Sequence, residues 1–188
     1  MSVWRSLPAL TLLAALVTSC SSGGQQVSDG GPLNGPDDTD AGSGEVCIPA
    51  KAGGSIAFGG DELHNYGSKA VVIDRIMLRK ASGLRLVEAV IVPNSSALIG
   101  YGAGWPPDPE ARNQPGIDWA HRRRAAGATL SPQADDAKVV NNLVLHLQVT
   151  DTTGVRMAGV LVHYHVGGSD YVWHNVLGLA VETKKKSC

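Results

Sequence analysis

Three histidines near the end of the chain have the spacing of a metal site. His163 and His165 alternate along one apolar run, and His174 lies on the next run, beyond a Gly-Gly turn signal. If the two runs pair as a hairpin, His163 and His174 come within about 4.5–8 Å of each other on its outward face. Grouped imidazoles bind copper or zinc, and Met157, with the same parity, would add a soft sulfur ligand. The alternative is that the histidines are polar residues on a solvated sheet face.

The stretch 100–126 combines aromatic, basic and rigid residues. Besides four prolines it holds Trp105, Trp119, Arg122, Arg123 and Arg124. A connection of this length inside a compact domain is typical of a functional or a disordered loop, and two tryptophans argue against disorder. Because Trp and Arg are enriched at binding hot spots, the loop would suit a carbohydrate, an anionic wall polymer, a lipid headgroup or a protein partner. The alternative is that the tryptophans cover a sheet edge while the arginines are solvated.

The sequence lacks the common catalytic motifs. It contains no G-x-S-x-G, S-x-x-K or H-E-x-x-H pattern, so nucleophilic and zinc-hydrolase signatures are missing. The glycines at 100, 102 and 104 stand in no strand–loop–helix unit that would hold a nucleotide. The formal net charge is −1, and no segment concentrates the positive charge of a nucleic-acid binder. We therefore expect a protein that is not an enzyme and binds no nucleic acid.

Short β-type runs separated by turn signals must position these residues. The runs cover 55–58, 70–79, 84–92, 139–149, 156–166 and 171–182. The apolar parity changes near Asp74-Arg75, which predicts a β-bulge there. Leu143, Leu145, Leu147 and Val149 alternate with polar neighbours, and a two-residue turn at Gly167-Gly168 or Gly168-Ser169 keeps the apolar residues of the last hairpin on one face. The pattern predicts an all-β antiparallel sandwich of about seven strands.

The start of the chain indicates export. An apolar run from Leu7 to Val17 follows Arg5 and has the length of a signal-peptide core, too short to span a bilayer. The segment Leu16-Val17-Thr18-Ser19-Cys20 resembles the lipobox of bacterial lipoproteins. This resemblance implies a signal peptide over 1–19, cleavage before Cys20, and a diacylglycerol on its sulfur. The protein would then be lipid-anchored to a cell membrane on its extracytoplasmic side.

The lipobox resemblance also predicts the state of the other two cysteines. If Cys20 carries lipid, Cys47 and Cys188 are an even pair in an oxidising compartment, which predicts a disulfide. Closing so long a loop stabilises a fold by at most about 4–5 kcal/mol. Between Cys20 and the domain, residues 20–44 are rich in Gly and Asp and poor in apolar side chains, so we expect a disordered tether. The domain is expected over 45–188.

A second resemblance concerns the fold. The stretch Asn65-Tyr66-Gly67-Ser68-Lys69-Ala70-Val71-Val72-Ile73 resembles the N-x-G-S-x-P-V-x-I opening of bacterial immunoglobulin-like domains, with Ala70 in place of the usual proline. It implies an immunoglobulin-like sandwich and no activity. We therefore predict a membrane-anchored envelope lipoprotein that presents a non-catalytic binding or structural module. Its expected partners are the membrane, through Cys20, and an envelope protein or polymer; the alternative is a copper or zinc protein using the histidines.

Overall fold

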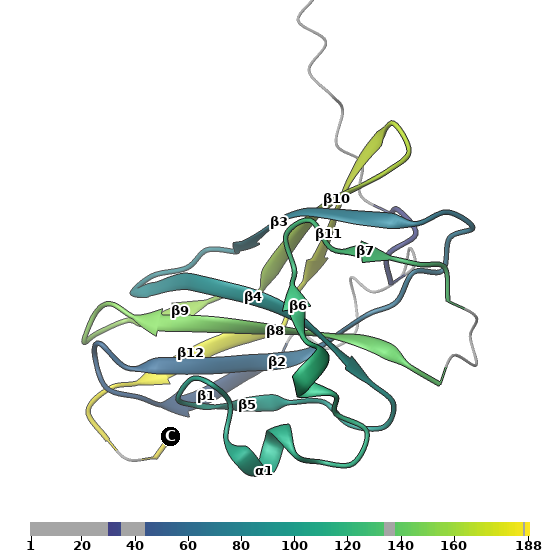
Figure 1. Ribbon diagram of the computed structural model, residues 1–188. Coiled ribbons are helices and arrows are strands. Elements are labelled where there is room, and N and C mark those ends of the chain that lie inside the picture. Colours follow the sequence, from purple (N-terminus) through teal and green to yellow (C-terminus); the bar gives the residue numbers. More distant parts are fainter. Residues whose placement is uncertain (1–29, 35–43, 134–137, 186) are drawn as a thin grey trace, which may run out of the picture.

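The computed structural model describes residues 30–34, 44–133, 138–185 and 187–188. These residues form twelve strands, and their only helices are the short α1 (Pro109–Arg112) and the 3-10 turn η1 (Trp119–His121) (Figure 1). The predicted all-β sandwich is confirmed, with more strands than the seven expected. The signal peptide and Cys20 lie outside the described residues. No described helix is long and apolar enough to cross a membrane.

A five-stranded antiparallel sheet forms one layer, with the long strands β2, β8 and β4 side by side (Figure 1). In spatial order its strands are β5 (Gly100–Ala103), β2 (Ser55–Leu63), β8 (Val140–Val149), β4 (Leu84–Asn94) and β6 (Arg123–Arg124). The predicted run 55–58 is too short, because the strand that begins at Ser55 continues to Leu63. β2 passes through Gly59 and Gly60 by a bulge, which adds one residue between Phe58 and Asp61.

A four-stranded antiparallel sheet forms the facing layer. Its order is β11 (Ser169–Asn175), β10 (Val160–Val166), β3 (Val71–Leu78) and β7 (Thr129–Leu130). The predicted bulge in β3 is confirmed, because His163 pairs with Arg75 and the next residue, Tyr164, with Ile73, which leaves Asp74 unpaired. Of the two turns predicted for the last hairpin, Gly167-Gly168 is the one that forms, since Val166 pairs with Ser169.

A third, small sheet closes one end of the sandwich. It consists of β1 (Glu45–Pro49), β12 (Gly178–Glu182) and β9 (Arg156–Met157), with β1 parallel to β12. The predicted continuous strands 156–166 and 171–182 are therefore wrong, because each divides between two sheets. At Gly159 φ is +134°, and a Cβ there would lie 2.0 Å from the Asn175 carbonyl oxygen. Only glycine permits this left-handed turn and close approach between β9 and β10.

The inner faces of the sheets form one apolar core. The predicted alternation of β8 is confirmed, because its Leu and Val side chains at 143, 145, 147 and 149 are all buried there. Phe58 of β2 and Tyr164 of β10 are its largest fully buried side chains. A smaller cluster on the outer face of the five-stranded sheet contains Val90, Val92, Ile99 and Val144. The sandwich thus has a second apolar patch that the 100–126 segment covers.

Residues 30–34 belong to the folded domain. Leu33 is 1% exposed and joins the main core. Its backbone N–H donates to the Tyr164 hydroxyl at 3.3 Å, and burial raises the pKa of that hydroxyl to about 12. The predicted tether over 20–44 and the predicted domain start at residue 45 are therefore wrong for this segment. One apolar side chain, Leu33, anchors this Gly- and Asp-rich stretch because it is buried in the main core.

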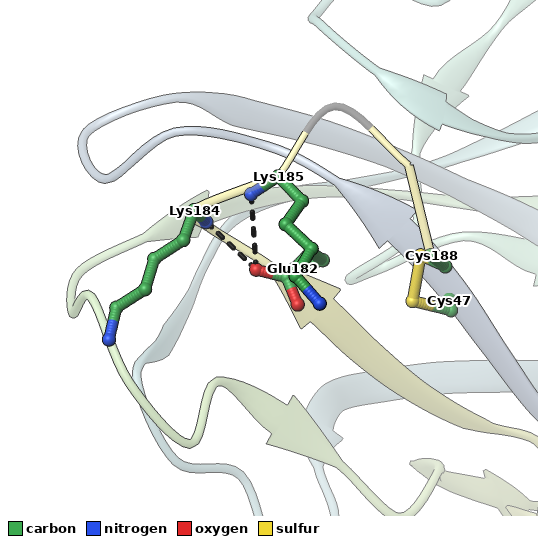
Figure 2. Close-up of a disulfide and its surroundings, with 5 residues drawn as sticks. All are labelled: Cys47, Glu182, Lys184, Lys185 and Cys188. Carbon is green, nitrogen blue, oxygen red and sulfur yellow. Dashed lines mark hydrogen bonds between the residues drawn. A yellow bond between two sulfur atoms is a disulfide. The ribbon is translucent and has the colours of Figure 1, made fainter.

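The predicted disulfide is confirmed, and it joins β1 to the end of the chain (Figure 2). Cys47 and Cys188 are bonded, their Cα atoms are 6.0 Å apart, and they are separated by 141 residues. Between β12 and Cys188, the Glu182 carboxylate accepts hydrogen bonds from the backbone N–H groups of Lys184 at 2.9 Å and Lys185 at 3.2 Å. These bonds lower the pKa of Glu182. The bridge and this turn hold the C-terminal segment against the third sheet.

Candidate functional site

A polar pocket lies where the β2 bulge, residues 30–34 and the β11–β12 connection meet. Its volume is about 430 Å³, within the range of small-ligand sites. Polar side chains form most of its wall, from Asn34, Asp61, Glu62, His64, Tyr66, Trp173 and Asn175. None of these was predicted as a site residue. The one local signal is the Gly-Gly-Asp-Glu run inside an apolar strand, which is typical of a bulge.

The β2 bulge creates the acidic wall. Asn142 on β8 donates from Nδ2 to the carbonyl oxygens of Gly59 at 3.0 Å and Asp61 at 2.8 Å, which holds the irregular backbone in place. A side chain at Gly60 would overlap the Tyr101 hydroxyl, since a Cβ there would lie 1.6 Å from it. After the bulge Asp61 pairs with the core residue Leu143. It therefore shares the inner face and is only 7% exposed.

Two asparagines hold the carboxylates. Asn175, at the end of β11, donates from Nδ2 to Asp61 Oδ1, and its own Oδ1 accepts the backbone N–H of Leu177. Asn94, at the end of β4, donates to Glu62 Oε1 at 3.2 Å. The pKa of the nearby Tyr101 is raised, first by burial and then by the Asp61 charge. The acidic wall is therefore built from the ends of three strands.

Residues 30–34 complete the opposite wall. The Asn34 backbone N–H donates to the His64 carbonyl at 2.7 Å, and its Nδ2 donates to the Glu62 carbonyl at 2.8 Å. In return, the His64 N–H donates to Asn34 Oδ1 at 2.6 Å. The His64 ring stacks on Tyr66, with centroids 4.4 Å apart, and Tyr66 is 52% exposed. The pocket thus has a fixed aromatic side with one ring open to solvent.

Two residues that line the pocket carry a buried nitrogen atom without a hydrogen-bond partner within the described part of the chain. These atoms are Trp173 Nε1 and His64 Nε2, and both are closed to solvent. Trp173 is 8% exposed. An unpaired buried donor costs about 1–3 kcal/mol, and native structures contain few of them.

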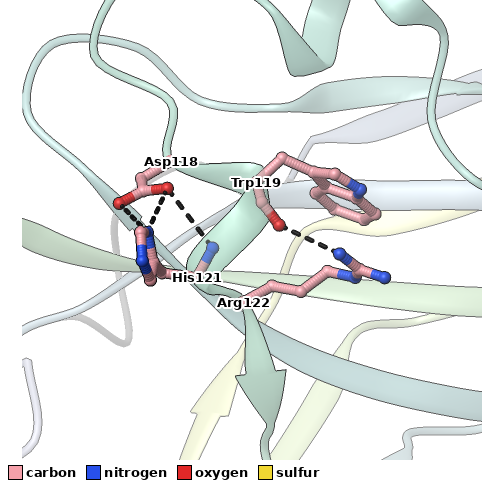
Figure 3. Close-up of polar contacts among 4 residues, drawn as sticks. All are labelled: Asp118, Trp119, His121 and Arg122. Carbon is pink, nitrogen blue, oxygen red and sulfur yellow. Dashed lines mark hydrogen bonds and ion pairs between the residues drawn. The ribbon is translucent and has the colours of Figure 1, made fainter.

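The predicted loop site is only partly assembled. Trp105 and Trp119 meet edge to face at 5.7 Å, and Trp105 also stacks on His146 at 4.7 Å. Figure 3 shows the Arg122 guanidinium beside the Trp119 ring, 4.8 Å from its centroid, and its bond to the Trp119 carbonyl. Asp118 caps this turn and accepts from His121, which lowers the Asp118 pKa (Figure 3).

The other two predicted arginines differ in position. Arg123 pairs with the main-core residue Ile91 and donates to Asn141 Oδ1 at 3.2 Å, whereas Arg124 pairs with Val90, which belongs to the smaller apolar cluster. The two tryptophans are half-buried and pack on the smaller apolar cluster. They cover a face of the sandwich, whereas the alternative interpretation of the sequence placed them over a sheet edge. Ligand binding by this loop stays a prediction.

The three histidines lie on the outward face of the four-stranded sheet. His163 pairs with Val172 and His174 with Leu161, so these histidines are diagonal neighbours, as predicted. The His165 ring is directed toward Asp74, since its Nδ1 lies 2.8 Å from Asp74 Oδ1.

Met157 is not on that face. It belongs to β9, pairs with Leu179 and is 2% exposed in the core. Its proposed role as a ligand beside the histidines is therefore wrong, because the Gly159 turn separates β9 from β10. Among the residues described, no group of three or more His, Cys, Asp or Glu side chains is placed to hold a metal. Copper or zinc binding stays a prediction.

No family model, curated protein or solved structure matches this chain. The immunoglobulin-like resemblance therefore stays a prediction, while the all-β sandwich stands on the strand pairing itself.

Proposed function

We propose that this chain is a lipid-anchored envelope protein whose β-sandwich binds a small polar ligand in the pocket beside the β2 bulge. The observation that carries the proposal is the pocket itself, whose polar wall is held in place by hydrogen bonds from Asn34, Asn94 and Asn175. The volume of the pocket is in the range of small-ligand sites, and the Tyr66 ring and Glu62 side chain on its wall are exposed to a ligand.

The pocket suits binding more than catalysis. Its carboxylates are held by Asn175 and Asn94, and no serine, threonine, cysteine or lysine is among the described residues that line it. A nucleophile would normally come from those residue types or from an activated carboxylate. Hydrogen bonds from three strand ends and from Asn34 preform the wall, which reduces the entropy that a ligand must lose on binding.

The lipid on Cys20 is the second part of the proposal, and it rests on the lipobox resemblance. Leu33 follows Cys20 by 13 residues, and an extended chain of that length spans at most about 45 Å. Docking of Leu33 beside the pocket therefore sets an upper limit on the distance between the anchor and the binding site. A tether that is free over the whole of 20–44 would allow a larger maximum distance.

Phase partitioning tests the anchor. The native chain should enter the detergent phase, and Cys20→Ala should shift it to the aqueous phase. An unchanged distribution would overturn lipidation at Cys20 without touching the pocket.

Retention on washed cell envelopes tests the pocket. In the Cys20→Ala background, Tyr66→Ala removes the exposed aromatic ring of the pocket wall, and we expect it to weaken retention about tenfold. Trp119→Ala is the matched control, because it removes a half-buried aromatic ring outside the pocket. If Trp119→Ala weakens retention and Tyr66→Ala does not, the binding site is the 100–126 segment and the pocket proposal fails.

A further inference from the structure

One edge of β3 is covered by other backbone at only one end of the strand. β7 pairs there with Val71 and Val72, and the loop before β7 bonds to Ile73 (Figure 1). We infer that an extended, acidic segment of a partner protein pairs with the remaining part of this edge, at residues 76–78, as an additional strand. The inference does not depend on the pocket or on its ligand, because no β3 residue lines that pocket.

In the described chain, the backbone of β3 has hydrogen-bonding groups without a strand partner along this edge. On the opposite side, the Arg79 N–H donates to the Gly159 carbonyl at 2.9 Å, and the Arg79 carbonyl accepts the Ala158 N–H at 2.8 Å. Successive residues of an antiparallel strand direct these groups to alternate sides, so those of Leu78 and Ile76 point to the open edge. Such an edge is a template for another strand.

A groove of about 530 Å³ runs beside this edge, between the two facing sheets. Its apolar lining includes Ile76 of β3 and Leu86 and Ala89 of β4, which pack against the main core while staying partly exposed. β4 is the poorer template, because its register shifts between Leu86 and Glu88, and a bulge disrupts edge pairing. A strand added to β3 would place every second side chain over the groove. These side chains should therefore be apolar.

The other side chains of the added strand would lie beside a basic run of β3. From Arg75 to Lys80 the sequence contains three basic residues and no acidic one. The preceding Asp74 is held by His165, whose Nδ1 lies 2.8 Å from its carboxylate. Acidic side chains on the partner strand would be attracted to this run, whereas basic ones would be repelled. Two copies of β3 would bring the run against itself, which disfavours a second copy as the occupant.

The groove adds little opposing charge. Glu88 is the one acidic residue among its described lining residues, and it pairs with His146 across β8. Arg124 pairs with Val90, two residues after Glu88 in β4, so it is a diagonal neighbour of Glu88 and offsets its charge. The charge of Arg75 then remains in the groove lining. The partner strand is therefore expected to alternate apolar and acidic residues.

Synthetic peptides test this pairing on the full chain in detergent. The probe is a capped peptide of about six residues that alternates valine with glutamate. One control alternates valine with lysine, and another is the acidic probe with every amide N-methylated, which keeps the charge and removes the donors. We expect the acidic probe to bind and to slow hydrogen exchange of the Ile76 and Leu78 amides in proton–nitrogen spectra. Both controls should bind at least about tenfold more weakly.

Charge reversal in the chain tests the basic run. Arg75 is exposed, so Arg75→Glu should fold normally, bind the acidic probe about tenfold more weakly and bind the lysine probe more tightly. Lys51→Glu is the matched control, because it makes the same change of charge at an exposed residue between β1 and β2. Equal effects of the two variants would overturn the inference, since only the net charge would then matter.

The remaining outcomes also overturn the inference. If the lysine probe or the methylated probe binds as well as the acidic one, the partner is not an acidic strand paired through its backbone. If no probe binds, the edge does not accept such a strand. In that case, exchange at Ile76 and Leu78 that slows as the protein concentration rises would identify a second copy as the occupant. None of these results affects the pocket, which is tested separately through Tyr66→Ala.

Discussion

The Asn175 side chain donates a hydrogen bond to the Asp61 carboxylate across 114 residues of sequence. It joins the end of β11 to the bulge of β2 and so connects the two facing sheets at the pocket. The same side chain accepts the Leu177 N–H, where the chain leaves one sheet for another. One asparagine therefore ends a strand and holds the acidic wall.

Asn175→Ala should destabilise the fold. It removes a donor to a carboxylate that is 7% exposed and leaves the Leu177 N–H without its acceptor. We expect the free energy of unfolding to fall by about 2–4 kcal/mol, measured by urea denaturation. His174→Ala, one residue earlier and on the outward face, should change it by less than about 1 kcal/mol. Equal effects of the two variants would show that the Asn175 contacts contribute little.

Leu33→Ala tests whether residues 30–34 belong to the domain. Because Leu33 is 1% exposed in the main core, the substitution should cost about 2–5 kcal/mol in unfolding free energy. Val139→Ala is the matched control, since Val139 is 55% exposed, and it should be almost neutral. If the Leu33 variant is as stable as the control, residues 30–34 do not belong to the folded domain.

Loss of the disulfide should lower stability without changing the fold. Replacing Cys47 and Cys188 together by alanine opens a loop of 141 residues, and the expected loss is at most about 4–5 kcal/mol. Thermal unfolding of native and variant chains measures it, with and without reductant. Reductant should lower the melting temperature of the native chain and leave the variant unchanged. If reductant does not change the melting temperature of the native chain, the disulfide is contradicted.

Stability should fall as the pH falls below neutrality. Burial lowers the pKa of His146 and of His163 from the ordinary value of 6.5. The unfolded chain then binds protons at a higher pH than the folded chain, so stability is full above about pH 6.5 and declines as the pH drops below it. At His146 the nearby Glu88 opposes the shift and Arg85 adds to it.

Urea denaturation at pH 8 and pH 5.5 measures this dependence, and His146→Gln should make it shallower. The native chain and the His146→Gln variant must be compared at both pH values, because the substitution also alters the stacking on Trp105. An identical slope in the two chains would remove His146 as a contributor.

The sequence by itself determined the features that depend on neighbours along the chain. The apolar alternation of β8 and the bulge at Asp74 follow from local parity, because strand side chains alternate with a period of two. Turn chemistry limited the last hairpin to a turn at Gly167-Gly168 or Gly168-Ser169, and the strand pairing selects the first. The all-β class follows from the same patterns. The pairing of Cys47 with Cys188 could be predicted because only these two cysteines remain once the lipobox resemblance assigns Cys20 to the lipid.

Only the tertiary structure decided which distant residues meet. Leu33 looks like an isolated apolar residue in a polar stretch, and its burial depends on a core built by other strands. Asp61, Trp173 and Asn175 carry no motif, since strand pairing and one bulge bring them to the same pocket. The division of 156–166 between two sheets likewise depends on the approach of Asn175 to Gly159. Local periodicity specifies the direction of each side chain, but its neighbours are selected by long-range packing.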